Sequence, residues 1–515
     1  MLGKCPRWLL AGRSVVRYLG SDGRDFFVGL RHMLKQWPVQ VGGAWCQGRR
    51  WQLVRVLTTM DFTLDPTRWA EEQFGECKLG DQRRMLRAVK LAAQVAAHPD
   101  GSTPQQTGDW NDCKAAYRLF DNERVTFAAL AAPHWNRTRH PGVGHYLLLG
   151  DTTELDFGRH REVDGLSPVG NGGGLGFLLH SALMVGSESE AILGLAGQEL
   201  FHRKARPLGE SRYDRSQRAR ESEVWGRVID QIGTPDAGVR FTHVFDRGAD
   251  NYEVYCHLLQ NRCDWVIRAS HLKRKVIVDG NKTRLCDYLN TLPVADVYVL
   301  QLRGSAQCQR REAKLEVRFG VVTLPQPSMR SPWLRQCGIA SLTQWVIEVR
   351  EAHTPRGVKP LHWVLYTSHP IMSFDDAWRA IGYYEKRWLI EEFHKALKTG
   401  CRLESRQYST SARLEALTGL LSVVAVRLLQ LKGIARTEPQ RPAAGVVPDI
   451  WLKAMRALQR LPAACTLGVF YRHLARLGGF LGRKHDGEPG WITLWRGFKK
   501  LALAVRVLEN HKKCG

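Results

Sequence analysis

Three acidic side chains stand where a protein could hold divalent metal ions. Asp151 follows the apolar run 146–149, and Asp246 follows the apolar run 239–245. Both runs are predicted strands, and catalytic groups gather at the carboxyl ends of strands in open α/β sheets. Glu391 lies on a later predicted helix. Three carboxylates favour Mg²⁺ or Mn²⁺, and two such ions can activate an attacking oxygen and stabilise a leaving oxygen in phosphoryl transfer.

The predicted helix 374–398 has one polar face and one apolar face. At 100° per residue, four side chains that suit phosphate chemistry fall within an arc of about 60°: Tyr384, Arg387, Glu391 and Lys398. Arginine and lysine bind phosphate oxygens, tyrosine donates a hydrogen bond and glutamate binds a metal. The predicted buried face consists of Leu389, Ile390, Phe393 and Leu397. Taken alone, the polar face could equally be a solvated surface with ion pairs, just as a single aspartate at a strand end is often only a turn residue.

The net charge indicates a polyanionic partner. Lys and Arg number 75 against 50 Asp and Glu, a formal net charge of +25. Nucleic acid is the commonest partner for such an excess. A basic protein without such a partner, or one that binds acidic membranes, is the alternative at this stage. The most apolar run, 414–431, contains Glu415, Arg427 and Gln430, so we expect a buried helix there and no membrane span.

The 12 cysteines include no C-x-x-C pair. The sequence therefore suggests neither a zinc site nor a redox motif. The irregular spacing in a long chain fits a reducing cytoplasm better than a disulfide scaffold.

The order of the predicted elements fits a ribonuclease-H-like α/β domain. Three strands come first, followed by helix, strand, helix and strand; their ranges are 146–149, 177–185, 191–195, 221–232, 239–245, 251–259 and 264–268. Residues 270–362 interrupt this pattern with strand-like runs at 296–302, 314–324 and 343–350, and we interpret them as a β-rich insertion. A strand at 363–367 precedes the helix 374–398, and the chain from Ser411 onward is mainly helical.

The part of the chain before this domain is predicted to be helical and basic. Asp81 is expected to cap a helix at 82–97 that carries Arg83, Arg84 and Arg87. A second helix is expected at 112–120. The apolar face of the first helix is assigned to Leu86, Val89, Ala93 and Ala96. Residues 1–59 hold ten Lys and Arg but two acidic residues; they are either a basic DNA-binding arm or translated upstream sequence, with Met60 as the natural start.

Three segments resemble the family-four insertion-sequence DDE transposases, the family of the Tn-five transposase. They are GDTTEL at 150–155, FDRGAD at 245–250 and YEKRWLIEEFHK at 384–395. The family's Y-x2-R-x3-E-x6-K signature is present in Tyr384, Arg387, Glu391 and Lys398. Shorter likenesses at 69–74, 79–84 and 475–480 extend the resemblance over about residues 69–501. Residues 1–59 have no counterpart.

The resemblance implies roles for individual residues. Asp151, Asp246 and Glu391 would be the catalytic residues and the ligands of two Mg²⁺ ions, which Mn²⁺ could replace. Contacts to DNA phosphates near the cut are implied for Arg268, Tyr384, Arg387 and Lys398. The basic surface of the predicted helix 82–97 makes Arg83, Arg84 and Arg87 further candidates for DNA binding, with a solvated amphipathic helix as the equal alternative. Trp363 matches a residue that stacks on a base flipped out of the duplex, and Trp388 matches a second aromatic of that step. Core packing is the alternative for both tryptophans.

The resemblance also implies the organisation and the activity. A helical domain at 60–125 would bind transposon ends, residues 126–405 would form the catalytic domain, and a helical domain at 406–515 would dimerise. The implied activity is cut-and-paste transposition: a nick at each inverted-repeat end, a hairpin, hairpin opening and joining of the 3′ ends to target DNA. The partners would be DNA and a second copy of the chain, with no membrane, in the bacterial cytoplasm at the nucleoid. Two alternatives stay open: a ribonuclease-H-like nuclease without strand transfer, and a weak or end-binding-defective copy that acts as a DNA-binding inhibitor.

Overall fold

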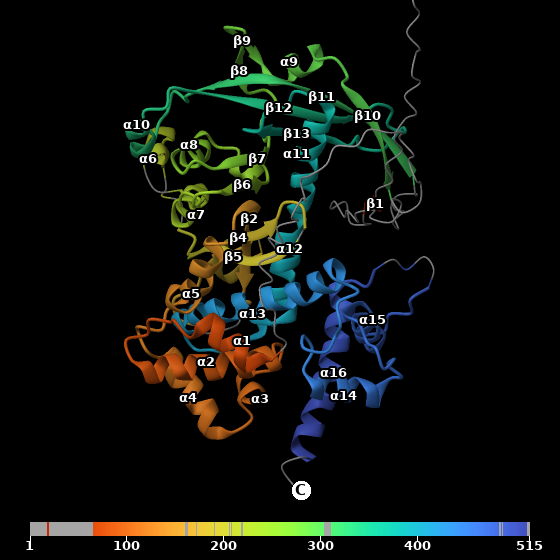
Figure 1. The fold of residues 1–515 in the computed structure, drawn as a ribbon. Coiled ribbons are helices and arrows are strands. Elements are labelled where there is room, and N and C mark those ends of the chain that lie inside the picture. Colours follow the sequence, from red (N-terminus) through yellow and green to blue (C-terminus); the bar gives the residue numbers. More distant parts are fainter. Residues whose placement is uncertain are drawn as a thin grey trace, which may run out of the picture.

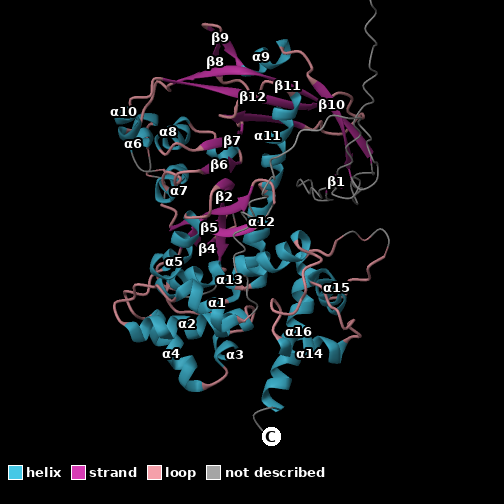
Figure 2. Ribbon diagram, in the orientation of Figure 1, coloured by secondary structure: helices cyan, strands magenta, loops and turns pink. Residues whose placement is uncertain are grey.

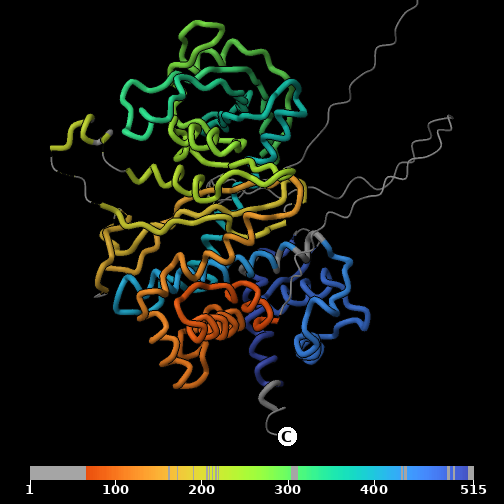
Figure 3. The backbone as a smooth tube through the Cα atoms, turned by 60° about the vertical axis from the view of Figure 1, so that its left-hand side comes forward, coloured from red at the N-terminus to blue at the C-terminus, as the bar shows by residue number. Residues whose placement is uncertain are grey.

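The computed structural model describes residues 18–19 and 65–511, apart from 160–162, 171, 190, 205–206, 208, 218–219, 303–310, 484–485 and 487. The prediction of a basic arm or of a start at Met60 lies outside the described residues. Figure 1 shows a sheet in the upper half of the molecule and helices from both ends of the chain in the lower half. Figure 2 shows the strands in the upper part, with helices around them, and helices in the lower part. In the turned view of Figure 3 the segments from the two ends of the chain again lie in the lower half.

Five strands form the centre of a 13-stranded sheet, in the order β5-β4-β2-β6-β7. They span Gly144–Asp156 (β2), Gly174–Gly186 (β4), Ile192–Phe201 (β5), Val239–Phe245 (β6) and Asp264–Arg268 (β7). The strands β5, β4 and β2 are antiparallel, and β2, β6 and β7 are parallel. This order confirms the predicted ribonuclease-H-like sheet. A short strand, β3 (Ser167–Val169), extends it beyond β4.

The β-rich insertion continues the same sheet. The strand after the insertion, β13 (His362–Thr367), pairs antiparallel with β7, and the sheet then runs on through four further strands: β12 (Ser341–Glu351), β11 (Arg311–Pro325), β10 (Asp296–Leu302) and β1 (Tyr18–Leu19). The insertion also contains a hairpin and two short helices: β8 (Lys275–Val278), β9 (Asn281–Arg284), α9 (Leu285–Thr291) and α10 (Pro332–Cys337). Another short helix, α6 (Arg212–Gln217), comes earlier in the chain, between β5 and β6.

Helices cover both faces of the central sheet. One apolar cluster joins the sheet to α7 (Val224–Ile232) and α8 (Tyr252–Gln260). A larger cluster joins the other face to α5 (Phe127–Arg139) and to α13 (Ser411–Thr437). The prediction of a buried helix at 414–431 is confirmed, because even Arg427 is only 1% exposed. Among the residues that the structure describes, no helix combines the length and the apolarity that a membrane crossing needs.

The helices from the two ends of the chain lie below the sheet (Figure 1). They are α1 (Pro66–Phe74), α2 (Gln82–Ala97), α3 (Thr103–Thr107), α4 (Trp110–Phe120), α14 (Asp449–Leu458), α15 (Leu467–Leu477) and α16 (Trp491–His511). Asp81 caps α2 as predicted, since its carboxylate accepts a hydrogen bond from Arg83 N. The apolar face assigned to α2 was wrong at Leu86, which is 56% exposed, whereas Leu91 and Ala92 are buried. Packing against α1, α4 and α13 decides this face.

The helix predicted at 374–398 is divided into three parts. They are α11 (Phe374–Lys386), α12 (Trp388–Lys395) and a π-helical turn, Ala396–Gly400. Around Arg387 the backbone tightens, because Arg387 N donates to Tyr384 O and Ile390 N donates to Arg387 O. Irregular turns inside a helix often occur at functional sites. The predicted apolar face is confirmed for Ile390, Phe393 and Leu397, which are buried.

Candidate active site

Asp151 lies within strand β2, where that strand leaves its parallel neighbour. Pairing between β2 and β6 ends at Leu149 and Val244, while pairing between β2 and β4 continues to Asp156. The prediction that Asp151 follows the end of its strand was therefore wrong, because the antiparallel partner carries the strand further. Asp151 still comes directly after the segment that is hydrogen-bonded on both sides.

Asp246 immediately follows β6, as predicted. Its carboxylate accepts a hydrogen bond from Gly248 N at 2.8 Å and caps a short 3₁₀ turn, Arg247–Ala249. Gly150 keeps β2 close to this strand end, since a Cβ on Gly150 would lie 2.4 Å from the ring of Phe245. The small residue before Asp151 thus allows the aromatic ring before Asp246 to pack against the backbone of β2.

Glu391 on α12 is connected to Asp151 through one arginine. Arg387 Nη2 lies 2.5 Å from Glu391 Oε1, and Arg387 Nη1 lies 3.5 Å from Asp151 Oδ2. The arginine side chain is 17% exposed. The structure therefore brings together, across β2 and α12, the two members of the predicted carboxylate triad that are farthest apart in the sequence.

Burial and neighbouring charge raise the pKa of Asp151 to about 7. Burial is the largest cause; the Arg387 guanidinium opposes it, and the negative charges of Asp246 and Glu391 add to the increase. The negative charges of Asp246 and Glu391 therefore both act on Asp151, even though the three carboxylates come from separate elements. Such clustering of like charge, opposed by a single arginine, is typical of functional sites.

This pKa leads to a prediction about stability in the absence of metal. An acid whose pKa is raised in the folded state binds more protons there than in the unfolded chain, so stability falls as pH rises from about 4 through about 7. Asp151→Asn removes the titrating charge. At pH 8, with a chelator present, we expect this variant to unfold at a higher temperature than the natural chain, by on the order of 4 kcal/mol in stability. The difference should shrink as the pH falls and should nearly vanish below about pH 4. Thermal unfolding across this pH range is the measurement, and a gap that is independent of pH would contradict the prediction.

The donor set suits a divalent metal in its chemistry. Three carboxylates provide the hard oxygen ligands that Mg²⁺ and Mn²⁺ prefer. Within the described part of the chain, however, no three His, Cys, Asp or Glu side chains are gathered closely enough to form a ligand group. Arg387 lies between two of the carboxylates and supplies the positive charge there. The three carboxylates therefore fit Mg²⁺ or Mn²⁺ by ligand type and by charge. Arg387 is the cation that competes with such an ion for Asp151 and Glu391.

Tyr384 and Arg268 extend the polar site beside Arg387. The Tyr384 hydroxyl is hydrogen-bonded to Arg268, and burial raises the pKa of this tyrosine. Arg268 Nη2 also donates to His362 O at 3.3 Å. Arg268 is the last residue of β7. Two arginines and a tyrosine donor are therefore gathered next to the carboxylates, as phosphate binding requires.

Lys398 and the two tryptophans lie around this centre. Lys398 Nζ is 3.4 Å from Glu404 in the loop after the π turn, and Glu404 accepts a hydrogen bond from Asp156 N at the end of β2. Trp363 is a half-buried residue of β13 that packs against the larger apolar cluster. Trp388 is a half-buried residue at the start of α12, next to Arg387.

The three N-terminal arginines differ in their surroundings. The Arg83 side chain is 90% exposed and forms an ion pair with the capping residue Asp81 at 3.2 Å. Arg84 donates to Leu79 O at 2.8 Å, and Arg87 lies 2.6 Å from Asp112 on α4. Arg84 and Arg87 therefore also stabilise the helical module itself.

A residue of this site that the sequence reasoning did not use is Asp250. Its buried carboxylate accepts hydrogen bonds from Ser270 N at 2.7 Å, from Tyr255 at 3.1 Å and from Arg274 at 2.5 Å. These contacts tie the turn after Asp246 to α8 and to the segment after Arg268. The sequence did contain a signal for Asp250, because this residue is the last of the FDRGAD motif that also contains Asp246.

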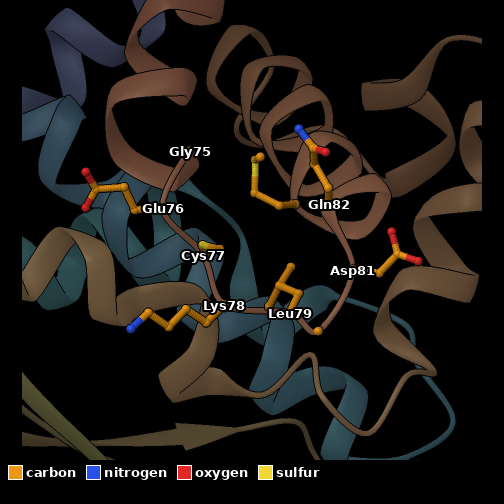
Figure 4. Close-up of a pocket in the computed structure, with 9 residues that line it drawn as sticks. Gly75, Glu76, Cys77, Lys78, Leu79, Asp81 and Gln82 are labelled. Atoms are coloured by element: carbon orange, nitrogen blue, oxygen red, sulfur yellow. The ribbon is translucent and has the colours of Figure 1, made fainter.

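A separate hollow of about 260 Å³ lies in the loop between α1 and α2 (Figure 4). Figure 4 shows Glu76 and Lys78 pointing away from it, on a loop that leads to the cap Asp81. It contains none of the catalytic candidates; its lining residues are Gly75, Glu76, Cys77, Lys78, Leu79, Gly80, Asp81, Gln82 and Met85.

Comparison with known families matches three parts of the chain. Residues 66–125 match the transposase DNA-binding family, residues 215–427 the transposase DDE domain, and residues 423–512 the Tn5 transposase dimerisation domain. The DDE match includes Asp246 and Glu391, and Asp151 lies before it. Together with the ribonuclease-H-like sheet, these matches define a DDE transposase. Taken together, the three matches support a Tn5-like DDE transposase. The chain is accordingly a DNA transposase with domains for DNA binding and for dimerisation.

Proposed function

We propose that the chain is a cut-and-paste transposase whose catalytic residues are Asp151, Asp246 and Glu391. The observation that carries this proposal is that Asp246, at the end of β6, and Glu391, on α12, both act electrostatically on Asp151 of β2. Their position at the boundary between the parallel and antiparallel parts of the sheet supports it further.

Each residue has a proposed task in the reaction. Two divalent ions held by the three carboxylates, Mg²⁺ or in its place Mn²⁺, would supply activation of the attacking oxygen and stabilisation of the leaving oxygen. Arg268, Tyr384, Arg387 and Lys398 hold the phosphates on either side of the cut. Trp363 and Trp388 stack on a base extruded from the duplex, which offsets the few kcal/mol that unstacking costs.

Four displacements at phosphorus follow one another at this site. Water attacks the phosphodiester at the transposon end, and the 3′ oxygen leaves as a hydroxyl. This hydroxyl attacks the opposite strand, which closes a hairpin and releases the flanking DNA. A second water opens the hairpin and restores the 3′-hydroxyl. The two 3′-hydroxyls then attack phosphodiesters of the target DNA.

The domain organisation supports this sequence of steps. We assign end binding to residues 60–125, with Arg83, Arg84 and Arg87 as contacts to DNA, catalysis to residues 126–405 and dimerisation to residues 406–515. The inverted-repeat ends must be held together during cleavage and joining, so the active assembly is a homodimer on two ends. The bound partners are the transposon ends and the target duplex.

A cleavage assay tests the proposal. The substrate is a duplex that carries the inverted repeats flanking this gene, incubated with the full chain in Mg²⁺ or Mn²⁺. We expect nicked strands first, hairpins second and open ends third, followed by joined products when supercoiled target is added; chelation of the metal should stop all of them. Nicks without hairpins or joining would indicate a nuclease without strand transfer. Tight binding without any nick would indicate a DNA-binding inhibitor and overturn the proposal.

A further inference from the structure

Arg387 is bound by the carboxylates that are proposed to hold the metal. Its two terminal nitrogens contact different partners, Glu391 at 2.5 Å and Asp151 at 3.5 Å. A partly buried arginine that bridges two carboxylates neutralises them without any other cation. In the free protein, therefore, the charge of these two side chains is already compensated in part.

The contacts of Arg387 use oxygens that a metal ion would need. Asp151 Oδ1 accepts a hydrogen bond from Thr152 N at 2.8 Å, and Asp151 Oδ2 faces Arg387. Glu391 Oε1 also accepts from Arg387. A divalent ion and the guanidinium thus compete for the same negative charge. Closer approach of the three carboxylates to one ion requires Arg387 to move aside.

An alternative anion for Arg387 is provided by the neighbouring donors. Tyr384 and Arg268 lie next to Arg387. These three side chains are hydrogen-bond donors, so they suit a phosphodiester and not a cation. Arginine binds phosphate in the same bidentate way as it binds carboxylate. A DNA phosphate in this position would compete with Asp151 and Glu391 for the guanidinium.

We propose that Arg387 couples metal binding to DNA binding: it partly compensates the charge of Asp151 and Glu391 in the free protein and transfers to a DNA phosphate in the complex, which leaves both carboxylates to the ion. This inference rests on the proposed function. Because coupling between two ligands is reciprocal, DNA raises the affinity for the metal and the metal raises the affinity for DNA by the same factor. This coupling keeps the affinity of the site for the metal low until a transposon end is bound.

The test is a titration of the full chain with Mn²⁺ alone, followed by electron paramagnetic resonance of free Mn²⁺ or by calorimetry. It is repeated with a pre-cleaved end duplex, which leaves no bond to cut. We expect the duplex to tighten Mn²⁺ binding by about 5- to 150-fold, the usual range of coupling between sites. In Arg387→Gln, the free chain should bind Mn²⁺ about tenfold more tightly than the natural chain, and the duplex should add less than about twofold.

Three further variants make the result decisive. Arg379→Gln removes the same charge from an exposed position on α11 and should behave like the natural chain. Arg387→Lys keeps the charge but loses the bidentate contact, so it should lie between the natural chain and Arg387→Gln, and it serves if Arg387→Gln fails to fold. Unchanged or weaker Mn²⁺ binding in free Arg387→Gln, or equal affinity of the natural chain with and without duplex, would overturn the coupling. Glu391→Gln reports separately on the site: Mn²⁺ binding that survives this change would overturn the proposed function instead.

Discussion

Glu391→Ala is expected to abolish strand cleavage while binding of the transposon ends is retained. The variant removes one of three carboxylates and leaves the DNA-binding match at 66–125 untouched. Loss of one group that stabilises charge in a transition state lowers the rate by about a hundredfold to a thousandfold, and loss of a metal ligand should reach at least the upper figure. Because Arg387 then loses its 2.5 Å contact with Glu391, more of its charge is available to DNA, and end binding should be equal or slightly tighter.

The measurements are cleavage of labelled end duplexes and binding by gel shift. Asp375→Ala is the matched control, since Asp375 is an exposed carboxylate in the first turn of α11. It should cut at the natural rate. Normal cutting by Glu391→Ala would show that the assignment of the catalytic glutamate is wrong.

Asp250→Ala is expected to destabilise the protein strongly and to impair cleavage. The Asp250 side chain is fully buried and bound to Arg274. Removal of one partner from a buried ion pair typically costs 3–5 kcal/mol, because the other charge is left without compensation. The turn that carries Asp246 would also lose its connection to Ser270 and Tyr255.

A double-mutant cycle with Arg274→Met separates the ion pair from the rest of the network. Replacement of both partners by apolar residues, Asp250→Leu with Arg274→Met, should cost less than Asp250→Leu alone. Urea unfolding gives the stabilities, and Asp287→Ala on the exposed side of α9 is the control for loss of a carboxylate. An unfolding midpoint unchanged in Asp250→Ala would refute the role assigned to this residue.

The sequence predicted the elements best where local signals were complete. The bounds of β6, for example, agree with the prediction because its apolar run ends directly at Asp246. The far half of β2 was missed, since residues 152–154 are polar and are held in the strand by β4, a distant partner. The helix α5 was missed because Pro133 lies inside it and its apolar residues are mostly alanines.

The sequence predicted which residues belong to the site, but it did not predict all the contacts between them. Helical periodicity placed Tyr384, Arg387 and Glu391 on one face of a helix, and the ion pair between Arg387 and Glu391 is of the local i,i+4 kind. The contact of Arg387 with Asp151 joins two elements far apart in the chain, and helical periodicity contains no information about it. The same holds for Asp250 and Arg274, whose pairing depends on how the insertion leaves β7.

The helix α13 has a consequence for how the protein is made on the ribosome. It packs against α2, α4 and α5 from the start of the chain, and Arg427 lies over the ring of Trp69 at 5.0 Å. Just before this helix, Tyr408 is hydrogen-bonded to Thr103 at 2.9 Å. A nascent chain that ends before residue 411 therefore has its N-terminal helices but lacks the segment against which they pack. Completion of the N-terminal module waits for nearly the whole polypeptide, so an interrupted translation product would emerge with both its DNA-binding and its catalytic parts unfinished.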